Sequence, residues 1–381
     1  EYGTTTTAMA SIIYKIDSST TLKFNSLFVN SSSDKVGYFG IDGKGRNRDA
    51  IANTDEGFFQ QNIQFNENLI YVNQLIGTHK FDKINVDWGV GHNFVNAQEP
   101  DRKRLSFENY QYALDNDPNT NPIFYSNVDF DNQRYFQDIQ DEELNGRLNL
   151  AYKATDQIKL NFGYNARTKE RQFNNVRYGY DIIDNSGIAD VNDLNSFFTL
   201  DNLNLTNNAG TYEIKVIKPY LNLSNTNRPG LDENTYKGNL DIYAGYFNTE
   251  INFGEKWLIV PGVRVESFDQ YIEYDVINLG VNGNDNISAS DVLFLPSLSL
   301  KYALNDDQNL RFSASQTISL PEFKEAAPFV YESVSQRIGG NPDLLGQKEG
   351  FDYTNVKDVS YSKIINMDLK YEWFVTKSEL I

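Results

Sequence analysis

The most regular feature of the chain is an alternation of apolar and polar residues near its end. From Ile365 to Trp373, odd-numbered positions are apolar or aromatic and even-numbered positions are polar or charged. Because successive side chains of a β-strand point to opposite faces, this period of two predicts a strand with one apolar face. The same alternation recurs at 84–90, 148–152, 158–164, 257–265 and 292–302, among other segments. The pattern predicts an all-β protein with about eleven strands of about 10 to 15 residues each.

The connections between the predicted strands alternate in length. Short polar turns are predicted near 17–19, 81–83, 155–156, 254–255, 305–307 and 375–377. Long irregular segments are predicted near 33–56, 97–140, 173–234, 273–290 and 320–361. In an antiparallel up-and-down sheet, alternate connections lie at opposite ends, so one end carries short turns and the other carries long loops. Outer-membrane barrels show this asymmetry, with short periplasmic turns and long extracellular loops.

Aromatic residues lie beside several of the predicted short turns. Phe81, Tyr152, Trp257, Tyr302 and the cluster at 371–374 are all within a few residues of one. Tyr and Trp settle where hydrocarbon meets lipid headgroups, so this placement indicates a membrane-interface girdle. The alternative is the general enrichment of aromatic residues in strands. Strand length and turn alternation together favour the membrane interpretation.

The composition is compatible with a membrane barrel and argues against several other classes. The mean hydropathy is -0.53 and no apolar run approaches the roughly 18 residues of a transmembrane helix, but a barrel strand needs apolar residues only at alternate positions. The 34 basic and 52 acidic residues give a net charge of -18, the wrong sign for binding nucleic acid.

Catalytic chemistry is not predicted. The chain has no cysteine and 2 histidines, His79 and His92, neither of which lies in a recognisable nucleophile or metal motif. The acidic run Asp141-Glu142-Glu143 is interpreted as a solvated charge run at a strand entrance. We therefore predict that the protein is not an enzyme.

The segments after residue 235 resemble a known family. The stretches at 245–266, 295–302 and 309–317, the motif Pro321-Glu322-Phe323-Lys324-Glu325-Ala326-Ala327-Pro328-Phe329, and the stretches at 340–344 and 371–374 look like late barrel segments of TonB-dependent outer-membrane receptors, in the family's order. The likeness is greatest to receptors of Bacteroidetes-like bacteria. Before residue 235 only the strand rhythm agrees.

The resemblance implies a large antiparallel transmembrane β-barrel of about 22 strands, of which residues 1–381 would form about half. A signal peptide, an N-terminal plug domain and the remaining strands would then lie outside this chain. Because an open sheet edge leaves backbone groups unpaired in hydrocarbon, the missing strands are expected from other residues or from another chain. The whole of 1–381 is thus interpreted as one partial barrel domain.

The resemblance also implies a function and a location. The protein would lie in the bacterial outer membrane, in contact with its lipid, and would take up a scarce nutrient with energy delivered by TonB. The nutrient, such as a ferric siderophore, a glycan or a peptide, would bind the extracellular loops and the protein's own plug. A surface lipoprotein is a further candidate partner, and nucleic acid is not one.

Two other functions stay open on the sequence alone. The first is a passive porin, or a structural barrel within a larger outer-membrane complex, which needs neither plug nor TonB. The second is a soluble extracellular β-sheet binding module, which would bury the apolar face against a second sheet. A plug domain and a TonB box upstream of Glu1 would favour uptake over the first alternative.

Candidate ligand residues lie in the long segments and on the polar strand face. Aromatic residues in loops can stack on a ligand or pack within the loops, and inward-facing charges can line a lumen or only solvate it. The candidates are Tyr110, Tyr112, Tyr178, Tyr180, Phe329 and Tyr331 in the long segments, with Arg264, Glu266 and Arg311 on the polar face.

Calcium is the one metal kept as a candidate. Asn282, Asn284 and Asp291 belong to an oxygen-rich run whose spacing resembles a degenerate calcium loop. The first ligand position is Gly280, and an ordinary turn cluster of Asn, Gly and Asp is the favoured interpretation. No other cofactor is predicted.

Overall fold

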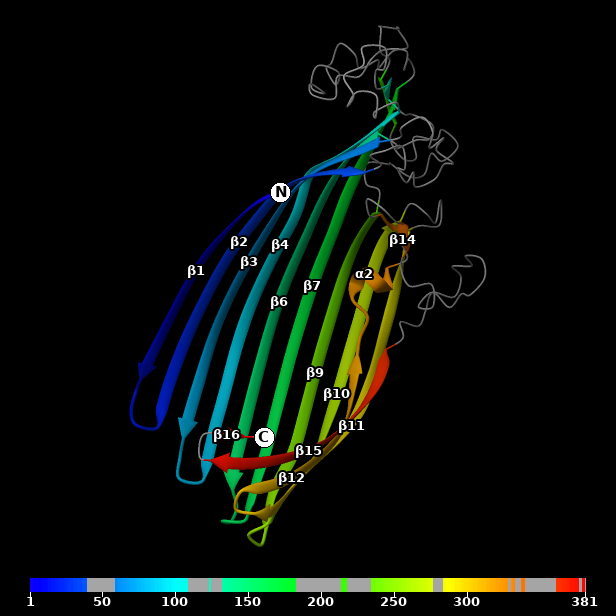
Figure 1. The fold of residues 1–381 in the computed structure, drawn as a ribbon. Coiled ribbons are helices and arrows are strands. Elements are labelled where there is room, and N and C mark those ends of the chain that lie inside the picture. Colours follow the sequence, from blue (N-terminus) through cyan, green and yellow to red (C-terminus); the bar gives the residue numbers. More distant parts are fainter. Residues whose placement is uncertain are drawn as a thin grey trace.

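The computed structural model describes residues 1–39, 59–108, 123–124, 132–182, 214–217, 234–276, 284–327, 330–332, 337–339, 361–376 and 379–380. Within these residues, eleven long antiparallel strands pair in sequence order and form one curved sheet (Figure 1). The predicted all-β fold class is confirmed. The long strands are β1 (Tyr2–Lys15), β2 (Thr20–Phe39), β3 (Phe59–Lys80), β4 (Ile84–Glu108), β6 (Asn132–Lys153), β7 (Ile158–Ile182), β9 (Asn234–Phe253), β10 (Trp257–Val276), β11 (Asn284–Asn305), β12 (Gln308–Ser319) and β15 (Ser362–Thr376).

The structure also contains several short strands and one short helix. β5 (Ile123–Phe124) pairs with β4, β8 (Ile214–Ile217) with β7, and β16 (Glu379–Leu380) with β15. β13 (Val330–Glu332) and β14 (Arg337–Gly339) form a separate small hairpin, and α2 (Phe323–Ala326) is a single helical turn. No helix of the described residues is long and apolar enough to cross a membrane.

The predicted strand length of about 10 to 15 residues is wrong for most strands. β4 and β7 each have 25 residues, and β4 runs through 97–108, which was predicted to be loop. A membrane-spanning strand needs only about 9 to 11 residues. Beyond that length, neither face has to be apolar, so the alternation fades while the backbone pairing continues. Hydrophobic patterning therefore underestimates the length of strands that extend beyond the apolar band.

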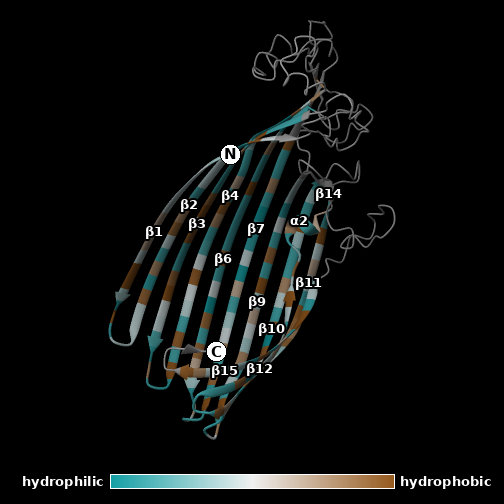
Figure 2. Ribbon diagram, viewed as in Figure 1, coloured by the Kyte–Doolittle hydropathy of each residue, from teal (hydrophilic) through white to brown (hydrophobic). Residues whose placement is uncertain are grey.

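One face of the sheet leaves its apolar side chains uncovered. Phe294 is 65% exposed and Met367 is 71% exposed, while Leu298 and Leu300 are half-buried by their strand neighbours. Figure 2 shows the corresponding alternation of hydrophobic and hydrophilic residues along the strands. No described element packs over these side chains. This arrangement argues against the soluble module, whose apolar face would be covered by a second sheet.

The predicted short turns near 17–19, 81–83, 155–156, 254–255 and 305–307 are confirmed, and they lie at one end of the sheet (Figure 1). The turn predicted near 375–377 reaches Lys377, which lies outside the described residues. Asp17 organises the first of them, because its carboxylate accepts hydrogen bonds from the backbone N–H groups of Ser19 and Thr20, at 2.7 Å each. Gly254 takes a positive φ of 62° in the turn between β9 and β10. Beside that turn, the rings of Trp257 and Tyr302 lie 4.5 Å apart, and Trp257 is exposed, as expected for an interfacial girdle.

The first long strand has one paired edge. β1 pairs with β2 over its whole length and with no other strand among the described residues. Its side chains are exposed throughout. The described sheet is therefore a curved, open wall with a concave and a convex side.

Candidate functional site

A short segment lies on the concave side of the wall. After β12 ends at Ser319, the chain turns inward and forms α2 between β9 and β11 (Figure 1). We call residues 320–327 the inturned segment. The Glu322 N–H donates to the Glu325 carboxylate at 2.9 Å, and the Ala327 N–H donates to the Phe323 carbonyl at 2.9 Å. These bonds satisfy backbone groups at both ends of a helix too short to be stable alone.

The largest side chain by which the inturned segment packs on the wall is aromatic. Phe323 is 2% exposed, and a Cβ on Gly238 of β9 would lie 2.5 Å from its ring. Only glycine therefore leaves room for the ring against that strand. The surrounding cluster is formed by inward-facing residues of β7, β9, β10 and β11, namely Phe173, Tyr236, Leu240, Ile272, Tyr274 and Ile287.

Polar contacts hold the same segment. The Gln270 side-chain amide donates to the Pro321 carbonyl at 3.2 Å, and Arg171 lies 3.6 Å from the Glu322 carboxylate. The Lys169 ammonium and the Arg171 guanidinium lie 5.7 and 5.9 Å from the centre of the Phe323 ring, within the range of cation–π attraction. Both apolar packing and polar contacts thus hold the inturned segment against the wall.

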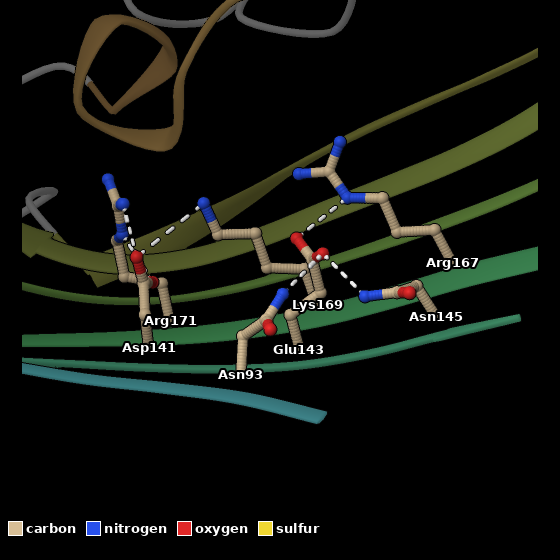
Figure 3. Close-up of polar contacts among 7 residues, drawn as sticks. All are labelled: Asn93, Asp141, Glu143, Asn145, Arg167, Lys169 and Arg171. Carbon is tan, nitrogen blue, oxygen red and sulfur yellow. Dashed lines mark hydrogen bonds and ion pairs between the residues drawn. The ribbon is translucent and has the colours of Figure 1, made fainter. Parts of the chain in front are cut away.

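The charges below the segment form two groups of ion pairs between β6 and β7 (Figure 3). The Arg171 Nε donates to Asp141 at 2.6 Å, and Lys169 lies 3.5 Å from the same carboxylate. The Arg167 Nε donates to Glu143 at 2.9 Å. Glu143 also accepts hydrogen bonds from the side-chain amides of Asn93 and Asn145.

These contacts correct the interpretation of Asp141 and Glu143 as solvated charges, whereas the Glu142 side chain is 66% exposed and agrees with that interpretation. The side chains of Asp141 and Lys169 are each only 13% exposed. The chain sequence places acidic residues on β6, and the antiparallel register brings Arg171 directly opposite Asp141 on β7. Because the cations come from another strand, the acidic run alone could not reveal the pairing.

Lys324 of α2 also lies in a desolvated position. Burial lowers its pKa from the ordinary value of 10.5, and nearby Arg171 lowers it further, while Glu99 of β4 opposes the shift. A cation is therefore held at the inturned segment at some energetic cost.

A pocket of about 200 Å³ opens between the inturned segment and the wall. Lys169 of β7 pairs in register with Leu240 of β9, which pairs in turn with Gln270 of β10, so these three side chains form a row across its floor. Leu320 and Pro321 contribute to the other side of the pocket. The site thus combines a cation, an apolar patch and an amide.

The predicted polar-face residues lie in two separate places. Arg264 and Glu266 are bonded to each other on β10, with Arg264 Nε to Glu266 Oε2 at 2.8 Å, and Glu266 lines the pocket. Arg311 of β12 donates to Glu372 of β15 at 2.8 Å, away from the pocket. Their contact with a ligand stays a prediction.

Three of the predicted aromatic residues lie in described strands, and their contact with a ligand stays a prediction. Tyr178 and Tyr180 lie near the end of β7, with backbone partners Arg134 and Asn132. Tyr331 lies in β13, opposite Ile338. Tyr110, Tyr112 and Phe329 lie outside the described residues.

The calcium candidates are not assembled into a loop. Asn284 and Asp291 both lie in β11, and seven residues of extended strand separate them by about 23 Å. Instead, the Tyr361 hydroxyl donates to the Asp291 carboxylate at 2.5 Å. Asn282 lies outside the described residues. Within the described ranges, no group of three acidic or histidine side chains is placed to hold a metal ion.

Sequence reasoning singled out Glu266 and the motif at 321–329, but it missed the wall residues Lys169, Gly238 and Gln270, although one signal was present. On β10, the inward positions Arg264 and Glu266 are charged, but the next inward positions include Phe268, Ile272 and Tyr274, which are buried. Apolar residues on a face that should meet water indicate that something covers it. The covering element is the inturned segment.

Comparison with protein families gives one match. The model for "TonB dependent receptor-like, beta-barrel" matches residues 87–348, which is more than half of the chain. Comparison with the sequences of curated proteins gives no match.

Comparison with solved structures matches the chain to uptake receptors and a transporter. The siderophore receptor PiuA from Acinetobacter baumannii is 12% identical with a TM-score of 0.51, covering 97% of this chain and 47% of that one. The ferric yersiniabactin uptake receptor FyuA from Yersinia pestis is 10% identical with a TM-score of 0.40, covering 97% and 51%. The copper transporter OprC is 10% identical with a TM-score of 0.40, covering 97% and 50%. The chain spans about half the length of these proteins, and the likeness to PiuA shows a shared fold alone.

Proposed function

Because the chain belongs to the TonB-dependent receptor β-barrel family, we propose that it forms part of the wall of a receptor that takes up a scarce nutrient with energy delivered by TonB. Barrels of this family are outer-membrane proteins. The observation that carries the proposal is the division of the wall into two unlike faces. One face is apolar and uncovered, and the other carries charges, a docked segment and a pocket.

The uncovered face supports placement in a lipid bilayer. Phe294, Met367 and Leu369 are all at least 65% exposed, and in water such a surface would promote aggregation. Acyl chains would solvate it instead. The interfacial aromatic residues near the short turns, such as Trp257 and Trp373, would then lie at the periplasmic boundary.

Further strands would complete the barrel. The edge of β1 that has no partner strand among the described residues would expose a row of backbone groups to hydrocarbon, where each unsatisfied group costs several kcal/mol. Residues outside this sequence, or another chain, would supply those strands. A plug domain inside the completed barrel would be the part on which TonB pulls.

The nutrient would be selected at the end that carries the long loops. The candidates there are the aromatic residues named above, and a surface lipoprotein could assist them. The solved structure with a shared fold is a siderophore receptor, which supports a ferric chelate as one nutrient class. Glycans and peptides are the other classes proposed here.

A growth experiment on the full-length protein tests this proposal. The gene is deleted, and growth is compared in iron-limited, glycan-limited and peptide-limited media, with and without a complementing wild-type copy. We expect a defect in at least one medium that the wild-type copy repairs only when TonB is present. Repair that is equally complete without TonB would instead identify a passive porin.

A further inference from the structure

Three polar side chains lie side by side on the uncovered, convex face of the wall. Ser26 of β2 pairs in register with Asn73 of β3, which pairs in turn with His92 of β4. Register partners share one face of a sheet, and a row of partners leads from Phe294 across β10, β9, β7 and β6 to Trp88. His92 is four residues from Trp88 on the same strand, so it shares the uncovered face with Phe294. We call Ser26, Asn73 and His92 the polar strip.

The polar strip lies inside the apolar band of the wall. Its three members are 6, 7 and 8 residues from the short-turn ends of their strands, at residues 20, 80 and 84. A tilted strand needs about 9 to 11 residues to cross the hydrocarbon, so these positions do not reach its far side. The neighbouring rows on the same face are aromatic or apolar, namely Phe28, Tyr71 and Phe94 beyond the strip and Phe24, Leu75 and Val90 before it.

The same register row is also polar farther along the wall, but there it lies at a different height. The row continues from His92 across β6 and β7 to Asp241 of β9 and Asp269 of β10. These two carboxylates are each 12 residues from the short-turn ends of their strands, at residues 253 and 257. They lie beyond the hydrocarbon, so water and headgroups solvate them. The polar strip has no such access to water.

The polar strip has hydrogen-bonding capacity that a partner can reach. The side chains of Ser26 and Asn73 are half-buried and have no hydrogen-bond partner among the described residues. The His92 side chain is 43% exposed, and its Nε2 lies 2.9 Å from the Glu142 carboxylate. Because an ionised carboxylate can only accept, Nε2 donates this bond, and the neutral imidazole keeps Nδ1 as an acceptor. Acyl chains offer no hydrogen-bond partner, so polar groups at this depth favour contact with polar groups of protein.

We propose that the polar strip is the contact surface between two copies of this chain in the outer membrane. A twofold axis normal to the bilayer keeps both copies in the same orientation, and it places β2 of one copy opposite β4 of the other. Asn73 then meets its own equivalent on the axis, where each amide both donates and accepts. The Ser26 hydroxyl donates to His92 Nδ1 of the second copy. The strip is complementary to itself, which favours a second copy over an unrelated partner.

The rows beside the polar strip fit the same axis. Tyr71 and Leu75, each 40% exposed, are the middle residues of their rows, so each meets its own equivalent. Phe24 of one copy meets Val90 of the other. Two convex walls touch over only a few neighbouring strands, and the strip spans three. The inference goes beyond nutrient uptake, and it rests only on the placement of this face in a bilayer under the proposed function.

The mass of the full-length receptor in mild detergent, measured by analytical ultracentrifugation over a range of concentrations, tests the proposal. We expect a dimer for the wild type. Asn73→Leu removes the central amide and should raise the dissociation constant of the dimer about tenfold. Leucine suits a lipid-facing position, so this variant should fold at least as well as the wild type, and heat-dependent migration in gels checks this. A wild type that is monomeric at every concentration would overturn the proposal in favour of a face covered by lipid only.

A matched variant assigns the contact to the polar strip. Gln316 of β12 also carries an amide on the uncovered face, because it pairs in register with Ile365, which is 70% exposed. It is 8 residues from the short-turn end of its strand, at residue 308, so its height matches that of the strip. Gln316→Leu should leave the dimer unchanged. Equal weakening by Gln316→Leu and Asn73→Leu, or an unchanged dimer in Asn73→Leu, would overturn the assignment.

Distances between spin labels in outer membranes locate the contact independently. Asp82→Cys places a label in the exposed turn between β3 and β4, below the polar strip, and Asp306→Cys places one in the turn between β11 and β12. In a full-length background without other cysteines, the two labels of a dimer should lie closer together at residue 82 than at residue 306. The reverse order would mean that the copies meet through another surface and would overturn the proposal. A dimer without TonB-dependent growth would refute the proposed function alone, and TonB-dependent growth by a monomer would refute this inference alone.

Discussion

Two parts of the concave wall carry ion pairs but differ in what covers them. Near the short turns, Arg311 and Lys370 both contact Glu372, at 2.8 and 2.9 Å, and the Lys370 side chain is 60% exposed. Under the inturned segment, Lys169 and Asp141 form a pair that is mostly buried. The first group faces open space, whereas the second lies beside Phe323 and its apolar cluster.

This difference shows what decides the character of an inward-facing position. A wide barrel needs polar residues inside where water fills it. Where a segment of the chain itself covers the wall, inward positions such as Ile272 and Tyr274 can be apolar, and charged neighbours hold the segment instead of solvating the wall. The following variants test whether the covered region depends on packing, on shape or on charge.

Removal of the anchoring ring should have the largest effect. Phe323→Ala deletes a fully buried aromatic side chain and should weaken docking of the inturned segment by about 3 kcal/mol or more. Hydrogen exchange at the backbone N–H groups of Glu325, Ala326 and Ala327, which are bonded within α2, should accelerate about a hundredfold.

Phe294→Ala is the control for this change, because it removes the same ring from the uncovered face. Exchange within α2 should be unaffected there. Equal protection of α2 in wild type and in Phe323→Ala would show that the ring is not the anchor.

A change of shape alone should have the next largest effect. Gly238→Ala places a Cβ 2.5 Å from the Phe323 ring and should weaken docking by about 1 to 3 kcal/mol. The same exchange measurement reports it. Gly146→Ala provides the control, because its added Cβ would meet nothing within 4 Å. Similar results for the two substitutions would mean that the close fit of the ring is unimportant.

Removal of a shared carboxylate should have a smaller effect. Asp141→Asn leaves Arg171 and Lys169 without their common counterion and should lower stability by about 1 to 2 kcal/mol, after allowance for partial exposure. Glu250→Gln breaks the more exposed pair with Lys159 and should cost about 0.5 kcal/mol or less. The midpoints of thermal unfolding should keep this order, and a reversed order would show that burial does not strengthen the covered pair.

The smallest expected effect is a dependence of docking on pH. The pKa of Lys324 is lowered when the segment is docked and returns toward 10.5 when it detaches, so the detached state binds more protons between those two values. Docking should therefore strengthen as the pH rises through that window. Lys324→Met should remove this dependence.

An environment-sensitive label on Ser319→Cys can report docking, because Ser319 is exposed and the chain has no cysteine of its own. A docking signal that does not change with pH in the wild-type background, or a dependence that persists in Lys324→Met, would contradict this account of Lys324.

The sequence predicted the elements whose pattern repeats locally. The alternation at 365–373 predicted β15, and the turns near 17–19 and 254–255 lie where polar residues and glycine were expected to reverse the chain. Such features depend on residues within a few positions of each other. The strand ends were missed because β4 and β7 continue beyond the region where one face must be apolar.

The candidate site was predicted less well. Glu266 was expected to face inward, and it lines the pocket. Gln270, Lys169 and Gly238 were not among the predicted site residues. Each is ordinary within its own strand. Their roles come from neighbours on other strands and from the segment that covers them, and one strand's pattern contains no information about either.

The sequence by itself determined that the chain forms long strands with one apolar and one polar face, because a period of two depends only on backbone geometry. The tertiary structure decided which part of the polar face is covered. That choice depends on the return of residues 320–327 to the wall, where Phe323 fits against Gly238 and Arg171 bridges Asp141 and Glu322. These contacts join residues that lie far apart in the sequence, so only the folded register brings them together.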